Sequence, residues 1–201
     1  MPIMTERAGE TISGSIRDFI AQTYDLYTAP TYGSFLRVAS SLPAIDVIAV
    51  VTDIQTAPID TTRPVVARGR EVAAEAALLE ANPQLHITMR TTFAAVVVGY
   101  IEAGVPIPML PPQPPLIPGF VYPCTVDEVS LFTRDPGFLR LLMEAGASND
   151  LVTACLRHAA SAQQDPSFIV GAGKTLLAIL AEQPNRVAEL LPLLNRAQPH
   201  H

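Results

Sequence analysis

Residues 171–175 read Gly-Ala-Gly-Lys-Thr, which looks like the end of a phosphate-binding P-loop. The complete pattern is GxxxxGK[ST], with a glycine at each end so that the backbone can wrap the phosphates. With Gly173 as the second glycine, Phe168 occupies the first position and its side chain obstructs the turn. A P-loop also opens a βα unit of a parallel sheet, whereas the residues after Thr175 predict helix. We therefore expect no nucleotide site here.

Two glycines inside a predicted helix still need an explanation, because each costs about 1 kcal/mol relative to alanine in an exposed helix. Gly171 and Gly173 predict either a close approach between helix backbones or a division into two short helices.

Cys155 and His158 lie three residues apart on a predicted helix, a spacing that allows a shared face. A zinc site needs further ligands, and a Cys-His nucleophile needs an orienting residue that the sequence does not identify. The other histidines are His86, His200 and His201, of which the last two are either native or remnants of a tag. Cys124 and Cys155 form no CxxC pair, so we expect two buried thiols.

The acidic residues form no catalytic pair. Asp127 and Glu128 are adjacent, so in the strand predicted there they point to opposite faces. Asp53 and Asp60 flank the end of another predicted strand and are expected in a solvated loop. GxSxG, HExxH and Gly-rich dinucleotide motifs are also missing from the sequence. We expect no catalytic residues, no cofactor and no metal.

Composition limits the class of protein. Of the 201 residues, 49% are hydrophobic, which is typical of a folded chain, yet no apolar run reaches the roughly 18 to 20 residues that span a bilayer. The N-terminal residues lack the basic start and apolar core of a signal peptide, so we expect a cytoplasmic protein. The net charge is −6 and the basic residues are scattered, which argues against direct nucleic-acid binding.

Residues 10–133 are rich in β-branched residues and predict a small β-barrel. The run 46–56 is almost continuously apolar, as in a strand covered on both faces or closed into a barrel, and Gly99 indicates a bulge or a bend. Helix formers at 67–83 predict a helix inserted near 67–82 and ended by Asn82-Pro83. The expected strands are 11–19, 32–40, 46–56, 86–102 and 127–132.

Proline-rich residues 106–120 predict an extended, irregular segment. It could be a PxxP ligand, but no Arg or Lys flanks it, so a stiff connector at 106–118 crossing the barrel surface is favoured. A helical domain is expected over 134–198, with Asp135 and Asp165 as N-caps and Gly146 as a C-cap. Its expected helices are 136–145, 149–162, 167–182 and 185–196. The predicted fold class is α+β: a small barrel with an inserted helix, then a helical subdomain.

Five short stretches resemble the HAS-barrel, the β-barrel of HerA-type translocases and ATP synthase subunits. They are YGSFLRV (32–38), VIAVVTDI (47–54), NPQL (82–85), VVVGY (96–100) and PPQPP (111–115). Ala49 departs from the pattern, which often has glycine there. In HerA-type proteins an ATPase domain follows the barrel, whereas a short helical segment follows it here. The resemblance therefore implies assembly contacts, as in ring-shaped hexamers, without ATPase activity.

We accordingly expect a non-enzymatic assembly or adaptor module that binds itself or a protein partner, such as a DNA-processing ATPase or nuclease. An open barrel edge would be a natural contact. The alternative is a small-molecule binding protein or enzyme with a pocket between barrel and helices, where Asp53, Arg90, Tyr100 or His158 would converge.

Overall fold

The computed structural model describes residues 6–62, 65–67, 70, 74, 77, 80–163, 165 and 167–196. The strands are β1 (Gly9–Gly14), β2 (Asp18–Gln22), β3 (Phe35–Ala39), β4 (Ile45–Pro58), β5 (Met89–Glu102), β6 (Val105–Ile107) and β7 (Phe120–Pro123). The helices are α2 (Leu85–Thr88), α3 (Val126–Thr133), α4 (Phe138–Glu144), α5 (Asn149–Gln163), α6 (Ser167–Ile179) and α7 (Pro184–Arg196). The helix predicted at 67–82 falls largely outside the described residues.

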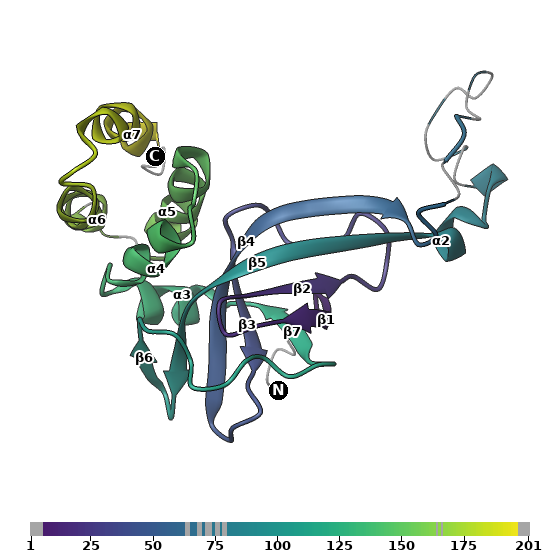
Figure 1. Ribbon diagram of the computed structural model, residues 1–201, viewed down its shortest axis with the longest axis horizontal. Coiled ribbons are helices and arrows are strands. Elements are labelled where there is room, and N and C mark those ends of the chain that lie inside the picture. Colours follow the sequence, from purple (N-terminus) through teal and green to yellow (C-terminus); the bar gives the residue numbers. More distant parts are fainter. Residues whose placement is uncertain are drawn as a thin grey trace.

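In the described part of the chain, six antiparallel strands form a closed barrel in the order β1-β2-β5-β4-β3-β7, because β7 pairs with β1. The short β6 continues the sheet from the end of β5. The predicted α+β combination of a small barrel with helices is thus confirmed (Figure 1). Closure also leaves the barrel without the open edge that would have suited strand addition.

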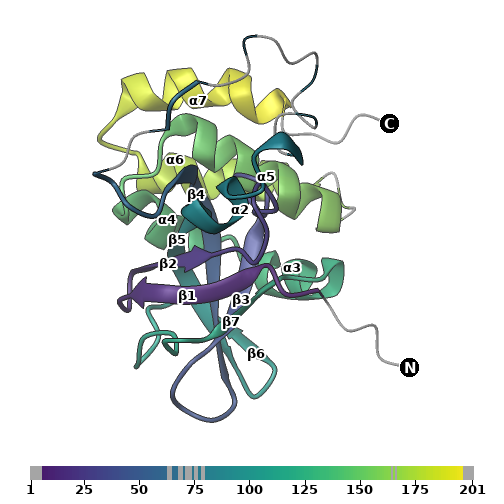
Figure 2. The same cartoon turned by 90° about the vertical axis from the view of Figure 1, so that its right-hand side faces the viewer.

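The middle of β4 is buried on both faces, as its apolar run predicted. Ala49 and Val51 face the barrel interior, where they pack with Phe19, Leu36, Phe93 and other residues. Ile48 and Val50 belong to a second apolar cluster that continues into α3–α7. Figure 2 shows these helices lying over one side of the barrel. One wall of the barrel is therefore also part of the core beneath the helices.

The strand predicted at 11–19 is instead the hairpin of β1 and β2. The Ser15 hydroxyl explains the reversal, since it accepts hydrogen bonds from the N–H groups of Arg17 (3.0 Å) and Asp18 (3.2 Å). Such a local side-chain acceptor stabilises a turn at the expense of a continuous strand.

The strand predicted at 127–132 is also wrong, because these residues form α3. Thr125 caps the helix by accepting from the Glu128 N–H at 3.2 Å, and the Glu128 carboxylate accepts from the Thr125 N–H at 2.8 Å. This reciprocal capping box satisfies two N–H groups that the first helical turn otherwise leaves unpaired.

The long strand predicted at 86–102 exists as β5, although its first residues form the single turn α2. The bulge predicted at Gly99 is confirmed, because Ile48 pairs with Gly99 while the next residue, Ala49, pairs with Val97. A Cβ on Gly99 would lie 2.7 Å from the Phe132 ring. Glycine therefore lets α3 approach the sheet.

Most of the proline-rich segment is irregular and lies along the barrel surface, but Pro106 and Ile107 belong to strand β6 and Phe120 begins β7, which the irregular segment predicted at 106–120 did not allow for. Leu116 donates its N–H to Ala39 O at 3.0 Å, and Pro115 forms an isolated bridge with Ser40. The Thr11 hydroxyl donates to Leu116 O. These contacts fix the segment between β1 and β3.

The predicted helices exist, and the signals for their ends are confirmed in part, since α4 begins at Phe138 and α6 ends at Ile179. Gly146 adopts φ +79° directly after α4, and its N–H donates to Met143 O at 3.0 Å. Ser148 accepts from the Leu151 N–H at the start of α5. Asp135 and Asp165 each accept an N–H two residues later, at Gly137 and Ser167. The expectation that Asp135 caps α4 is wrong, because α4 begins at Phe138 with Gly137 as its N-cap and without a side-chain cap. None of the helices in the described ranges is long and apolar enough to cross a lipid bilayer.

Candidate functional site

An open groove of about 900 Å³ lies between the barrel and the helices. Its floor is the outer face of β2 and β5, where Ile20 pairs with Ala94 and Asp18 pairs with Val96. Residues directly opposite in antiparallel strands point to the same side of the sheet. Pairing thus places Ile20 beside Ala94 and Asp18 beside Val96 beneath the groove, so that the floor is apolar except at Asp18.

The connection between α4 and α5 forms the facing wall. The left-handed conformation of Gly146 reverses the chain, so that residues 145–148 line the groove together with Leu141 and Leu151. Arg186 of α7 holds this turn from behind, donating to Ala147 O and, at 3.1 Å, to Asn149 Oδ1. The wall is therefore fixed by hydrogen bonds from a third helix.

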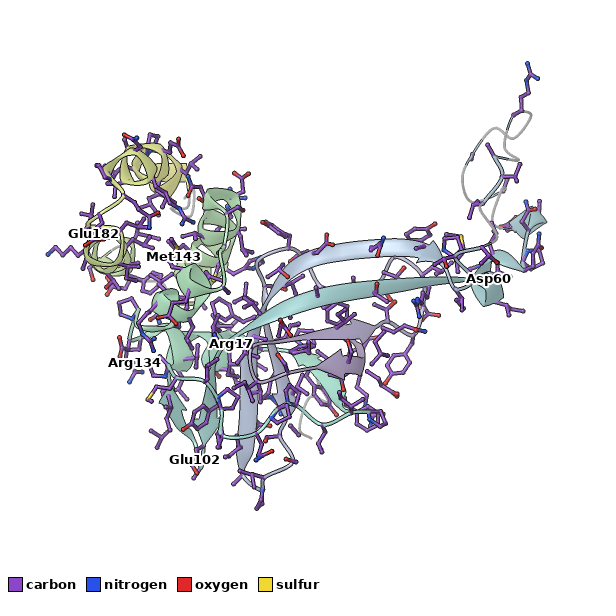
Figure 3. The ribbon with its side chains drawn as sticks, in the orientation of Figure 1. Arg17, Asp60, Glu102, Arg134, Met143 and Glu182 are labelled. Carbon is purple, nitrogen blue, oxygen red and sulfur yellow. The ribbon has the colours of Figure 1, made fainter. Side chains whose placement is uncertain are left out.

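Charged and hydroxyl groups surround this apolar floor. Arg17 comes from the β1–β2 turn, Asp18 is the first residue of β2, and Glu144 is the last residue of α4. The remaining polar lining residues are Ser13, Ser15, Tyr32, Thr52 and Ser148. In Figure 3, Arg17 is labelled near the junction of helices and barrel. An apolar floor with a few polar groups around it is the usual composition of a small-molecule site.

The four residues expected to converge in a pocket do not line this groove, and that expectation is wrong. Asp53 accepts from the Ile54 N–H, and Arg90 pairs with Ala57 far along the β4–β5 hairpin. Tyr100 lies opposite Val47 and Ile107, and His158 Nε2 lies 3.5 Å from Thr31 Oγ1. They occupy four separate places.

The groove residues were missed because they come from two distant segments, 13–20 and 141–151. The alternation over 11–19 predicts a strand, in which Arg17 is one more solvent-facing side chain. The Ser15–Asp18 turn is the signal that could have placed it at a loop.

Cys155 and His158 are not brought together as a reactive pair. Cys155 is fully buried in the core beneath the helices, and burial raises the pKa of its thiol. Burial also lowers the pKa of the half-buried His158 imidazole. Both cysteines are free thiols; Cys155 is buried as expected, whereas Cys124 is only partly buried. Within the described residues, no three His, Cys, Asp or Glu side chains cluster as metal ligands.

Glu128 lies in helix α3 and not in the expected strand, and its carboxylate makes contacts that stabilise the fold. Its Oε1 lies 2.9 Å from Arg37 Nε, while its Oε2 accepts the capping bond from Thr125. Both carboxylate oxygens are thus engaged, and the ion pair links α3 to β3.

The Gly-Ala-Gly-Lys-Thr stretch lies inside α6. The Thr175 hydroxyl bonds back to Gly171 O at 3.2 Å, as serine and threonine do within helices. A P-loop instead connects a strand to the first turn of a helix. The expectation that this stretch binds no nucleotide stays a prediction.

Both explanations offered for the α6 glycines are wrong. The helix is continuous, a Cβ on Gly171 would meet no atom within 4 Å, and one on Gly173 would meet only Leu194 Cδ1 at 3.8 Å. We therefore expect Gly171→Ala and Gly173→Ala each to raise the free energy of unfolding by about 1 kcal/mol, through better helix propensity. Urea denaturation followed by circular dichroism measures this. A loss of stability in either variant would show that the glycine has a packing role.

A scan against models of known protein families finds no match to this chain, and no curated protein is significantly similar to it.

Proposed function

We propose that this protein is a non-enzymatic assembly or adaptor module, and that the projecting end of the β4–β5 hairpin is its contact element. β4 and β5 have 14 residues each and extend well past the other strands (Figure 1). Toward the tip of the hairpin, the pairing of β5 with β2 ends at Thr92. The pairing of β4 with β5 continues beyond it, to Pro58 and Met89. We call residues 53–60 and 85–92 the arm.

The single observation that supports the proposal is that the arm carries exposed aliphatic side chains away from both apolar clusters. Ile54 is 41% exposed, Ile59 50% and Ile87 77%. A two-stranded ribbon is marginally stable without further packing. Exposed aliphatic side chains on a projecting element offer a contact for a protein partner.

The arm is held in place at its base, as a contact element should be. The Tyr27 N–H donates to the Thr91 hydroxyl at 2.9 Å, and the Thr56 hydroxyl lies 2.8 Å from the same group. Thr23 donates its N–H to Thr91 O at 3.0 Å. A fixed arm loses less conformational entropy on binding than a free loop.

The resemblance to HAS-barrels supports the same proposal, because such barrels provide subunit and partner contacts. The partner is accordingly a second copy of the chain or a DNA-processing ATPase or nuclease of the HerA-associated kind. Direct nucleic-acid binding is not part of the proposal, given the net charge of −6.

Native mass by light scattering, combined with affinity capture from the source lysate, tests this function. We expect a defined oligomer, or a stoichiometric partner bound to a chain of 21.5 kDa. The triple variant Ile54→Ser/Ile59→Ser/Ile87→Ser should abolish the association. Val170→Ser/Leu177→Ser/Leu191→Ser, which changes three exposed apolar residues of α6 and α7, is the matched control. A strict monomer that captures no partner would refute the proposal.

A second candidate function, small-molecule binding, is favoured by the groove of about 900 Å³ at the junction of barrel and helices. This volume lies within the range of roughly 300–1,000 Å³ found for ligand pockets.

A further inference from the structure

Arg17 is held in the groove by its own backbone. Its N–H donates to Ser15 Oγ at 3.0 Å, and its carbonyl accepts from the Val97 N–H at 2.7 Å. The second bond extends the pairing of β2 with β5 beyond Asp18, so the Cα of Arg17 is fixed beside the strand that forms the floor. A side chain on a fixed backbone is a better binding group than one on a mobile loop.

The guanidinium of Arg17 makes no hydrogen bond or ion pair with any residue of the described ranges. The two carboxylates of the groove differ in this respect. Asp18 Oδ1 accepts from the Ser15 hydroxyl at 2.8 Å, and Glu144 Oε1 pairs with Arg140 Nη1 at 2.8 Å. The cation is therefore the charged group with donors left for a ligand, and a guanidinium matches the geometry of a carboxylate.

Apolar surface continues from Arg17 into the groove. Ile20 remains 42% exposed on the floor, although its strand is paired on both sides. Leu141 and Leu151 line the opposite wall. A ligand that places an anionic group at Arg17 would lay a hydrocarbon tail across Ile20 and gain about 0.8 kcal/mol for each buried CH₂ group.

From this arrangement we infer that the groove binds a small amphipathic carboxylate, with the acid group at Arg17 and the tail between Ile20 and Leu151. This inference rests on the second candidate function and is independent of the arm. Binding involves no covalent step.

Three eight-carbon probes that differ only in the head group test the inference: octanoate, 1-octanol and octylamine. Each is titrated into the ¹⁵N-labelled full-length chain and followed by amide chemical shifts. We expect octanoate to shift residues 13–20 and 141–151 and to bind about tenfold more tightly than octanol, the gain of one charge-assisted hydrogen bond. Octylamine should bind no better than octanol.

Variants locate the head group. Arg17→Gln should lower the affinity for octanoate to that for octanol and leave octanol unchanged. Ile20→Ser should weaken both probes, because it alters the floor, and Arg90→Gln on the arm should alter neither. Arg17 is an exposed turn residue, so Arg17→Gln should leave the melting temperature unchanged. This measurement shows that the variant is folded.

Two contrary results are distinguishable. If octanoate and octanol bind equally, or octylamine binds best, the groove is a ligand site but the carboxylate inference is wrong. If none of the probes shifts the groove amides, both the inference and the second candidate function fail.

Discussion

Replacing Phe138 with alanine is expected to lower the free energy of unfolding by about 3–5 kcal/mol. Phe138 is 0% exposed and packs against two other rings, with centroid distances of 5.7 Å to Phe35 and 6.1 Å to Phe132. The contact with Phe35 is edge-to-face, an arrangement that adds about 0.5–1.5 kcal/mol to the burial of area. The three rings join β3, α3 and α4, so the cavity would open where barrel and helices meet.

Chemical denaturation of the variant measures this loss. The control is Phe120→Ala, the same substitution at a ring that is 42% exposed on β7. It should cost about 1–2 kcal/mol, clearly less than at Phe138, because Phe120 is already partly in water. Equal losses in the two variants would mean that the aromatic cluster is not the joint between barrel and helices.

Gly33→Ala is expected to destabilise the protein by about 2–5 kcal/mol, from backbone strain and overpacking together. Gly33 has φ +79°, a conformation that disfavours a side chain. An added Cβ would also lie 2.6 Å from the Ala154 Cβ and 2.8 Å from the Cys155 N. Since both contacts are with α5, relief requires the helix to move away from the barrel.

Gly104→Ala separates the two contributions. Gly104 has a similar φ of +83°, but a Cβ there would meet nothing within 4 Å, so its cost is the strain of about 1–2 kcal/mol alone. The excess loss in Gly33→Ala then measures the contact with α5. Gly33→Ala should also shift the amide chemical shifts of the groove residues, because the neighbouring Tyr32 lines the groove. Identical losses for both glycines would contradict the close contact.

The sequence predicted elements well where burial and local chemistry agreed. The apolar run of β4 indicated a strand buried on two faces, and Gly146 indicated the end of α4, because both signals are local. The stretch 127–132 is predicted as the strand that completes the barrel, although the Thr125–Glu128 capping box is a stronger signal for a helix start. Apolar and polar residues alternate across 11–19 without interruption. The pattern of β1 therefore continues into β2, and the turn between the two strands is hidden in it.

The groove could not be predicted in the same way. Ile20 and Ala94 become neighbours only through the pairing of β2 with β5, and Leu151 reaches them only because α5 lies against the loop at Gly33. No periodicity within either segment encodes these contacts. The polar candidates Asp53 and Tyr100 were chosen by residue type, and the pairing of β4 and β5 directs them elsewhere.

The wall that β4 and β5 share with the helices has a consequence for biosynthesis. These strands leave the ribosome before α4–α7, so the nascent barrel presents Ile48, Val50, Val96 and Val98 to water while their cover is still being translated. A bare apolar strip on a partly synthesised chain is a natural substrate for chaperones and a starting point for aggregation. Slow translation of the proline-rich segment would prolong that exposure, and rapid arrival of α4 would end it.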